Sequence, residues 1–156
     1  MKKPSVLFVC LGNICRSPLA EAAFRAEAAR VGLDVDADSA GVGGWHAGEP
    51  PDRRAQAVAR RHGVDISGYR ARKVVAEDFR RFTHVIALDH ENLAALEALR
   101  PQDGTAELKL LLDYVKGREG EAVDDPWYGP ASSFEVTWLE VKQAAEGLVK
   151  TFSEER

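Results

Sequence analysis

The sequence predicts an α/β fold of three layers, in which helices flank a central four-stranded parallel sheet. Short segments rich in β-branched and aromatic residues alternate with longer helical segments, which is the pattern of βαβ units. No repeat, low-complexity tract or linker divides the 156 residues, so we expect a single domain over residues 1–156. The candidate strands cover residues 6–10, 35–39, 83–88 and, more weakly, 107–112.

Helix signals fill the intervals between these strands. Residues 19–31 are rich in alanine. Residues 51–62 end at Gly63, which suits a helix C-cap, and residues 90–99 are followed by Pro101. The last helix has one continuous apolar stripe, with spacings of 4, 3, 4, 3 and 4, that predicts a core-facing helix: Phe134, Trp138, Val141, Ala145, Leu148 and Phe152.

Composition and charge exclude several classes of protein. The 45% apolar residues, 29% charged residues and net charge of −4 indicate a soluble globular protein and argue against a nucleic-acid binder. The apolar run at residues 6–11 is shorter than the roughly 7–15 residues of a signal-peptide core. No stretch approaches the roughly 20 apolar residues of a membrane span. Two cysteines five apart cannot build a disulfide framework. We therefore expect a cytoplasmic protein with no nucleic-acid partner and no membrane insertion.

Charged residues are distributed unevenly along the chain. Residues 53–81 contain nine Lys or Arg against three acids, whereas residues 119–156 contain nine acids against three Lys or Arg. One interpretation is that both segments are solvated helix faces. The other is that the basic segment attracts an anionic substrate or partner.

The loop between the first strand and the first helix is the candidate site. Ser17 is a favoured helix N-cap and Pro18 suits the first helical position, so the loop ends at a helix N-terminus, which favours anions. Gly12 and Asn13 tolerate left-handed turns that aim successive N–H groups inward as an anion nest. Arg16 can bind two phosphate oxygens at once. The predicted phosphate-binding residues are Leu11, Gly12, Asn13, Ile14, Cys15, Arg16 and Ser17.

A thiol begins this loop. The helix dipole, the loop N–H groups and Arg16 all favour the thiolate form of Cys10, which is the nucleophilic form. Full ionisation of an ordinary thiol gains only about 30-fold in thiolate, or ~2.1 kcal/mol. Most of any large rate acceleration must therefore come from holding a phosphorus atom in line and stabilising charge on its oxygens.

The nonapeptide CLGNICRSP, residues 10–18, resembles the signature of the low-molecular-weight protein tyrosine phosphatases: Cys, five residues, Arg and Ser near the N-terminus. The resemblance covers nearly the whole chain and agrees with that family's length and four-stranded parallel sheet. The other matching segments are DSAG at 38–41, HGVDISG at 62–68, EDF at 77–79, ALDHEN at 87–92 and DDPWYG at 124–129.

This resemblance implies roles for individual residues. Cys10 would attack phosphorus while Asp125 protonates the leaving oxygen, with Asp124 as the alternative acid. Arg16 would bind the phosphate. Ser17 would hydrogen-bond the thiolate, and Asn13 would hold the loop in shape with help from Ser39. The reaction would need no metal and no cofactor.

Phosphotyrosine hangs from a long flat ring and needs a deep slot with aromatic walls. Trp127 and Tyr128 follow Asp125 directly, and Trp45 lies in a glycine-rich loop that the resemblance places on the opposite side. The expected partners are phosphotyrosine-containing proteins, among them a bacterial tyrosine kinase by family analogy, with inorganic phosphate as product and inhibitor.

Four other activities can be weighed. A thioredoxin-coupled arsenate reductase needs further cysteines, and none follows Cys15. Protein arginine phosphatases carry threonine where this loop has Ile14, so Ile14 favours a tyrosine phosphatase. A binding module without turnover could lose Cys10 or Asp125, but both are present. A phosphocarrier is disfavoured by Arg16 and the Asp-Pro acid.

Two positions stay open. Cys15 is either a small packing residue or a redox partner that forms a reversible disulfide with Cys10. Tyr69 lies where many family members have a histidine nearby, so a loop-supporting role for that histidine is in doubt here. We interpret the four histidines as surface or packing residues: His46, His62, His84 and His90.

Overall fold

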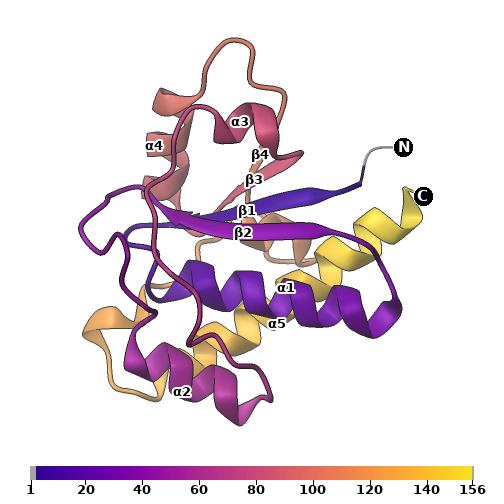
Figure 1. Ribbon diagram of the computed structural model, residues 1–156. Coiled ribbons are helices and arrows are strands. Elements are labelled where there is room, and N and C mark those ends of the chain that lie inside the picture. Colours follow the sequence, from indigo (N-terminus) through magenta and orange to yellow (C-terminus); the bar gives the residue numbers. More distant parts are fainter. Residues whose placement is uncertain (1–2, 156) are drawn as a thin grey trace.

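The computed structural model describes residues 3–155, and its centre is a sheet of four parallel strands. The strands are β1 (Ser5–Cys10), β2 (Asp36–Gly41), β3 (His84–Ala87) and β4 (Glu107–Leu110). Their order is β2-β1-β3-β4, so β1 lies inside the sheet (Figure 1). Phe8 of β1 is in register with Ser39 of β2 and Ile86 of β3.

Helices cover both faces of this sheet, as predicted. The helices are α1 (Arg16–Val31), α2 (Arg53–Arg61), α3 (Asp78–Arg81), α4 (His90–Leu99) and α5 (Ser133–Glu154). Figure 1 shows α1, α2 and α5 below the sheet and α3 and α4 above it. Two short 3-10 helices complete the structure, η1 (Leu111–Tyr114) and η2 (Pro126–Tyr128). The expected three-layer α/β fold is confirmed.

Strand β1 supplies side chains to a hydrophobic core on each face of the sheet. Val6 and Phe8 pack with α1, α2 and α5, whereas Leu7 and Val9 pack with α3 and α4. This alternation follows from the two-residue period of a strand, and it explains why residues 6–10 of β1 are all apolar. All six residues of the predicted stripe on α5 are buried in the larger core.

Several element boundaries differ from those predicted. Helix α1 begins at Arg16, with Cys15 rather than Ser17 as its N-cap. Helix α2 begins later than predicted, because the Asp52 side chain caps it by accepting a hydrogen bond from the Arg54 N–H. The weak strand prediction at 107–112 is correct only as far as Leu110, where the chain turns into η1.

The carboxyl ends of the parallel strands meet at one edge of the sheet, where open α/β sheets bind ligands. The loops after β1, β2 and β3 all leave from this edge, at the left in Figure 1. Within residues 3–155, no helix is both long and apolar enough to cross a membrane.

Candidate active site

The loop that follows β1 has one unusual backbone conformation. Asn13 has a φ of 61°, and no other non-glycine residue between 3 and 155 has a positive φ. Asparagine tolerates this left-handed conformation better than most residues do. The loop also lies in backbone contact with the chain after β2, because the N–H of Val42 donates to the carbonyl of Cys10 and that of Gly43 to Leu11. The two loops therefore form one unit.

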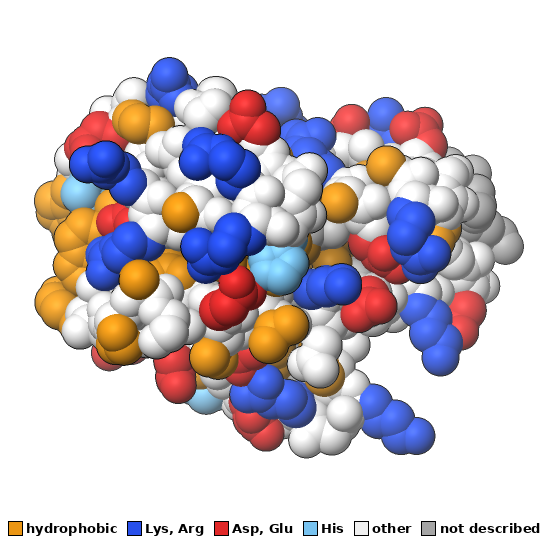
Figure 2. Space-filling model, turned by 90° about the horizontal axis from the view of Figure 1, so that it is seen from below, with side chains coloured by type: hydrophobic (Ala, Val, Ile, Leu, Met, Phe, Trp, Pro, Cys, Tyr) orange, Lys and Arg blue, Asp and Glu red, His pale blue; other side chains and the backbone are white. Residues whose placement is uncertain are grey.

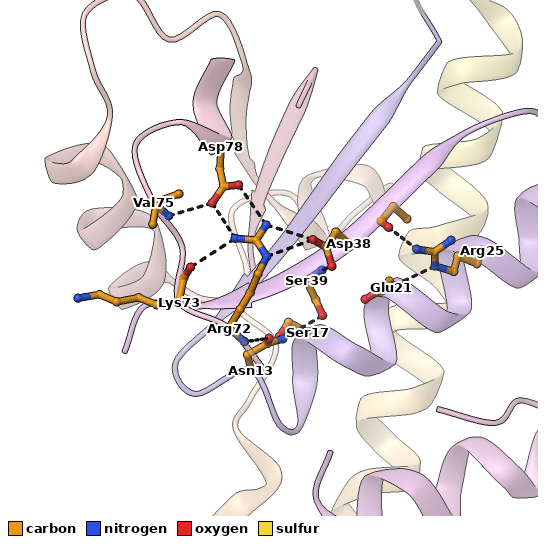
Figure 3. A network of polar contacts seen from close by, with 11 residues as sticks. Asn13, Ser17, Glu21, Arg25, Asp38, Ser39, Arg72, Lys73, Val75 and Asp78 are labelled. Carbon is orange, nitrogen blue, oxygen red and sulfur yellow. Dashed lines mark hydrogen bonds and ion pairs between the residues drawn. The ribbon is translucent and has the colours of Figure 1, made fainter. Parts of the chain in front are cut away.

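The Asn13 side chain holds this loop through three hydrogen bonds (Figure 3). Its Nδ2 donates to Ser17 Oγ over 2.8 Å and to Ser39 Oγ over 2.9 Å. Its Oδ1 accepts from the backbone N–H of Arg72 over 3.0 Å. Both amide protons are thus in use, and β2 and the segment before α3 both fix the loop.

Ser17 connects this support to the candidate nucleophile. Its Oγ lies 3.0 Å from Cys10 Sγ, and both residues are buried. Because Ser17 Oγ already accepts a hydrogen bond from Asn13, its own O–H is free to donate one to the sulfur. A donated hydrogen bond favours the thiolate. This bond also explains why the Ser17 hydroxyl does not cap α1.

Arg72 anchors the third support of Asn13, and sequence reasoning missed it. Its guanidinium group donates to both carboxylate oxygens of Asp78, each over 3.0 Å, and pairs with Asp38 over 3.1 Å. Asp78 is 3% exposed, whereas Arg72 is half-buried, so the acid side of this pair is shielded from solvent. Asp38 in turn accepts from the N–H of Ser39. The DSAG and EDF segments contain both acids, but their distance along the chain hides the contact.

Arg16 lies at the base of the site and is 2% exposed. Its Nη1 donates to Asp89 Oδ2 over 2.7 Å and to the carbonyl of Val123 over 2.8 Å. Burial by itself would lower the pKa of Arg16, but the negative charges of Cys10, Asp89 and Asp125 outweigh burial and raise it. Asp89 is the second residue that sequence reasoning missed; its signal was its position directly after a strand.

Asp125 reaches the same place from far along the chain. Its Oδ2 lies 3.6 Å from Arg16 Nη2, and its Oδ1 accepts from the N–H of Trp127 as the cap of η2. The N–H of Val123 donates to the carbonyl of Leu88, which ties this segment to the end of β3. Asp124, the alternative acid, is exposed and does not line the cavity.

A cavity of about 190 Å³ brings the predicted residues together. Asn13, Ser17 and Ser39 lie behind its wall as buried supports. Trp45 and Tyr128 are 70% and 92% exposed and stand at its mouth, and Trp127 is 38% exposed. The structure adds His46, whose ring lies 6.3 Å from that of Trp127. The lining residues are Cys10, Leu11, Gly12, Ile14, Cys15, Arg16, Trp45, His46, Asp125, Trp127 and Tyr128.

Comparison with known proteins assigns this chain to a family. Residues 5–156 match the model for "Low molecular weight phosphotyrosine protein phosphatase". The chain belongs to this family. It is 44% identical to the low molecular weight protein-tyrosine-phosphatase YfkJ of Bacillus subtilis, over 97% of each chain. It is 40% identical to the human low molecular weight phosphotyrosine protein phosphatase, over 94% of each chain.

A solved structure agrees with the computed one. The crystal structure of YfkJ from Bacillus subtilis matches with a TM-score of 0.92 and 43% identity, over 100% of this chain and 98% of that one. The family membership that residues 10–18 suggested is therefore confirmed, and the similarity extends over nearly the whole chain.

Arg54 holds one aromatic wall of the phosphatase cavity. Its guanidinium group lies 5.4 Å from the centre of the Trp127 ring and donates to the Trp127 carbonyl over 3.2 Å. Asp52 pairs with Arg54, and the N–H of Asp52 donates to the carbonyl of Ile14. The first turn of α2 thus joins the phosphate loop to the segment that contains Asp125.

Cys15 faces a different environment from Cys10. Burial raises the pKa of Cys15 well above its usual range, and the nearby Asp52 carboxylate raises it further. Both cysteines are free thiols. The redox-partner alternative for Cys15 stays a prediction, tested by titrating free thiols after peroxide treatment: two persistent thiols would contradict it.

Tyr69, near which the family resemblance suggests a histidine, lies between α2 and α3. It is half-buried, and burial together with the Glu21 carboxylate raises its pKa to about 12. Arg25 pairs with Glu21 over 2.8 Å on the same helix. Burial raises the pKa of Glu21. The side-chain Oδ1 of Asn13 accepts its hydrogen bond from the backbone N–H of Arg72.

Within residues 3–155, no group of three or more His, Cys, Asp or Glu side chains is arranged to hold a metal ion.

Proposed function

We propose that this phosphatase hydrolyses phosphotyrosine in proteins, and aryl phosphates, through a cysteinyl-phosphate intermediate. The observation that supports this most directly is that Cys10, Arg16 and Asp125 line one cavity with aromatic walls. A nucleophile, a fixed cation and an acid are the three groups that displacement at phosphorus requires.

In the first step, the Cys10 thiolate attacks phosphorus, and an S–P bond forms as the P–O bond to the tyrosine breaks. Arg16 Nη2 and the N–H groups of residues 11–17 bind the equatorial oxygens. Asp125 gives its proton to the departing oxygen. A tyrosyl phenolate has a pKa of about 10 in water, so it leaves poorly without that proton.

In the second step, the ionised Asp125 removes a proton from water, whose oxygen attacks phosphorus. The S–P bond breaks, phosphate forms and the Cys10 thiolate returns. Inorganic phosphate then occupies the same loop as product and inhibitor. Cys10 is the nucleophile of the first step, water is the nucleophile of the second, and Asp125 gives and then regains the proton, so the proposed reaction needs no metal and no cofactor.

The aromatic walls would select the substrate. Trp45, Trp127 and Tyr128 rise around a loop that holds the phosphate at its floor, so a long flat phenyl group spans the depth of the slot. Phosphoserine and phosphothreonine are too short to bring phosphorus to Cys10 between these walls. We therefore propose phosphotyrosine proteins as partners, a bacterial tyrosine kinase among them, in the cytoplasm.

The alternatives weighed from the sequence are not favoured. A module that only binds phosphate would not need Asp125 at 3.6 Å from Arg16. It would also not need the buried Ser17 hydroxyl group that lies beside the Cys10 sulfur. The apolar Ile14 lines the cavity where arginine phosphatases carry a hydroxyl group.

The decisive experiment compares three variants on phosphotyrosine peptides and on aryl phosphates of graded leaving-group pKa, with a chelator present. Cys10→Ser should abolish turnover. Asp125→Asn should slow poor leaving groups by about 10²–10⁴-fold and good ones much less. Asp124→Asn is the matched control and should behave as wild type.

Two results would reject these assignments. Equal slowing of good and poor leaving groups by Asp125→Asn would remove Asp125 as the general acid. Turnover by Cys10→Ser at a rate near wild type would remove the covalent intermediate. If neither of these results is obtained, the inactive Cys10→Ser variant can be used to trap the physiological substrates from cell extracts.

A further inference from the structure

Helix α2 presents an arginine-rich face to solvent. Four of its nine residues are arginine, while Ala55, Val58 and Ala59 turn inward to the core. The protein as a whole has a net charge of −4, so this basic face departs from the average of the molecule. Figure 2 shows Lys and Arg side chains gathered beside the hydrophobic patch at the left of the face that it views.

The four arginines divide into two pairs, each seven residues apart. Arg54 is neutralised by Asp52, and Arg61 by Glu135 over 3.2 Å. Arg53 and Arg60 are exposed, and neither forms an ion pair with an acid in residues 3–155. Seven residues make about two helical turns, so these two free cations lie about 10 Å apart along the helix.

The start of α2 adjoins the mouth of the active site. The N–H of Asp52, next to Arg53, donates to the carbonyl of Ile14 in the phosphate loop over 2.8 Å. On the other side of Arg53, Arg54 contacts Trp127 of the cavity wall. A peptide that leaves the cavity on this side passes Arg53 first and Arg60 two turns later.

We propose that Arg53 and Arg60 form a docking site for an acidic segment that flanks the phosphotyrosine of a protein substrate. This inference rests on the proposed function, since it names the substrate class for the same site. An extended peptide rises about 3.3 Å per residue, so acids three positions apart match the spacing of the two arginines. The docking site selects substrates in which two acids, separated by two residues, lie on one side of the phosphotyrosine.

The test compares three phosphotyrosine peptides: one with two acids three apart on the N-terminal side, one with the same pair on the C-terminal side, and one neutral. We expect wild type to prefer one acidic peptide by about threefold to tenfold in kcat/KM, as two exposed ion pairs allow. The preference should vanish in the double variant Arg53→Gln/Arg60→Gln. It should also fade near 1 M salt, where charges are screened beyond about 3 Å.

A matched control removes the same charge elsewhere. The double variant Arg80→Gln/Arg81→Gln alters α3, above the sheet in Figure 1, whereas α2 lies below it. This control should keep the preference for the acidic peptide. If both double variants lose it equally, overall charge is responsible and the docking site is rejected.

Hydrolysis of an aryl phosphate separates this inference from the proposed function. All these variants should hydrolyse it like wild type, because neither arginine pair lines the cavity. Absence of phosphotyrosine turnover by wild type would reject the function. Normal turnover with equal kcat/KM on the three peptides would reject the docking site alone.

Discussion

Asn13 Nδ2 donates a hydrogen bond to Ser17 Oγ over 2.8 Å, and this bond decides where the Ser17 proton points. With its lone pair engaged by Asn13, the hydroxyl group is left to donate to Cys10 Sγ, 3.0 Å away. An amide that never touches substrate therefore orients the donor that favours the thiolate. The side chain of Asn13 can be removed without disturbing the left-handed backbone, which makes this relationship testable.

Asn13→Gly should lower kcat by about tenfold to hundredfold, because glycine keeps the positive φ but loses all three side-chain hydrogen bonds. Cys10 should also react more slowly with iodoacetamide, since Ser17 no longer holds its hydroxyl group toward the sulfur. Stopped-flow hydrolysis of an aryl phosphate and timed alkylation measure the two effects. Unchanged rates in a folded variant would show that Asn13 does not act through Ser17.

Arg72→Met should destabilise the protein by about 1–3 kcal/mol, because the buried Asp78 carboxylate would lose its guanidinium partner and keep only the N–H of Val75. The double variant Arg72→Met/Asp78→Asn should recover part of this loss. Urea unfolding measures both values. Arg80→Met breaks only the exposed pairs with Glu77 and Asp103 and should cost under about 1 kcal/mol. An equal loss for Arg72 and Arg80 would contradict a buried anchor.

Cys15 should resist alkylation at pH 8 while Cys10 reacts. Burial and the Asp52 carboxylate disfavour the Cys15 thiolate, so its raised pKa keeps it in the unreactive thiol form at this pH. Mass spectrometry of peptides from iodoacetamide-treated protein should place the label on Cys10 alone. The matched variant Cys15→Ala should be labelled at the wild-type rate. Labelling of both cysteines at similar rates would overturn this assignment.

Gly147→Ala should destabilise the protein by about 1–2 kcal/mol. A Cβ atom at this position would lie 1.9 Å from the carbonyl oxygen of Tyr114, so α5 and η1 would have to separate. This cost exceeds the roughly 1 kcal/mol that alanine gains over glycine inside a helix. Ser153→Ala, at an exposed position of the same helix, is the control and should change the thermal midpoint little. A stabilised Gly147→Ala protein would mean that the helices can part without cost.

Much of the fold was predictable from local pattern. The apolar run of β1 reflects burial on both faces of the sheet, the stripe on α5 reflects the helical period, and His90–Leu99 is helical over the predicted range. Boundaries failed where a side chain had another partner. Ser17 has the residue type of a helix cap, yet its hydroxyl group contacts the Cys10 sulfur instead. The sequence alone does not show which of these two roles the hydroxyl group takes.

The site was predictable in its chemical groups and less so in its supports. Cys10, Arg16 and Asp125 can be recognised from the sequence by their residue types and motifs. Arg72 and Asp89 do not, because their importance comes from contacts made 59 and 73 positions along the chain, with Asn13 and Arg16. Residues that position others need the three-dimensional structure to be recognised.

The crowding of negative groups around Arg16 has a consequence for how ligands enter. One buried guanidinium already neighbours Asp89, Asp125 and the Cys10 sulfur. A phosphate that joins them adds negative charge that a single cation cannot balance, so we expect its arrival to draw a proton from solvent. Binding then becomes a joint uptake of anion and proton. The affinity for phosphate should weaken as the medium becomes alkaline, and the phosphate-bound enzyme should release its product most readily there.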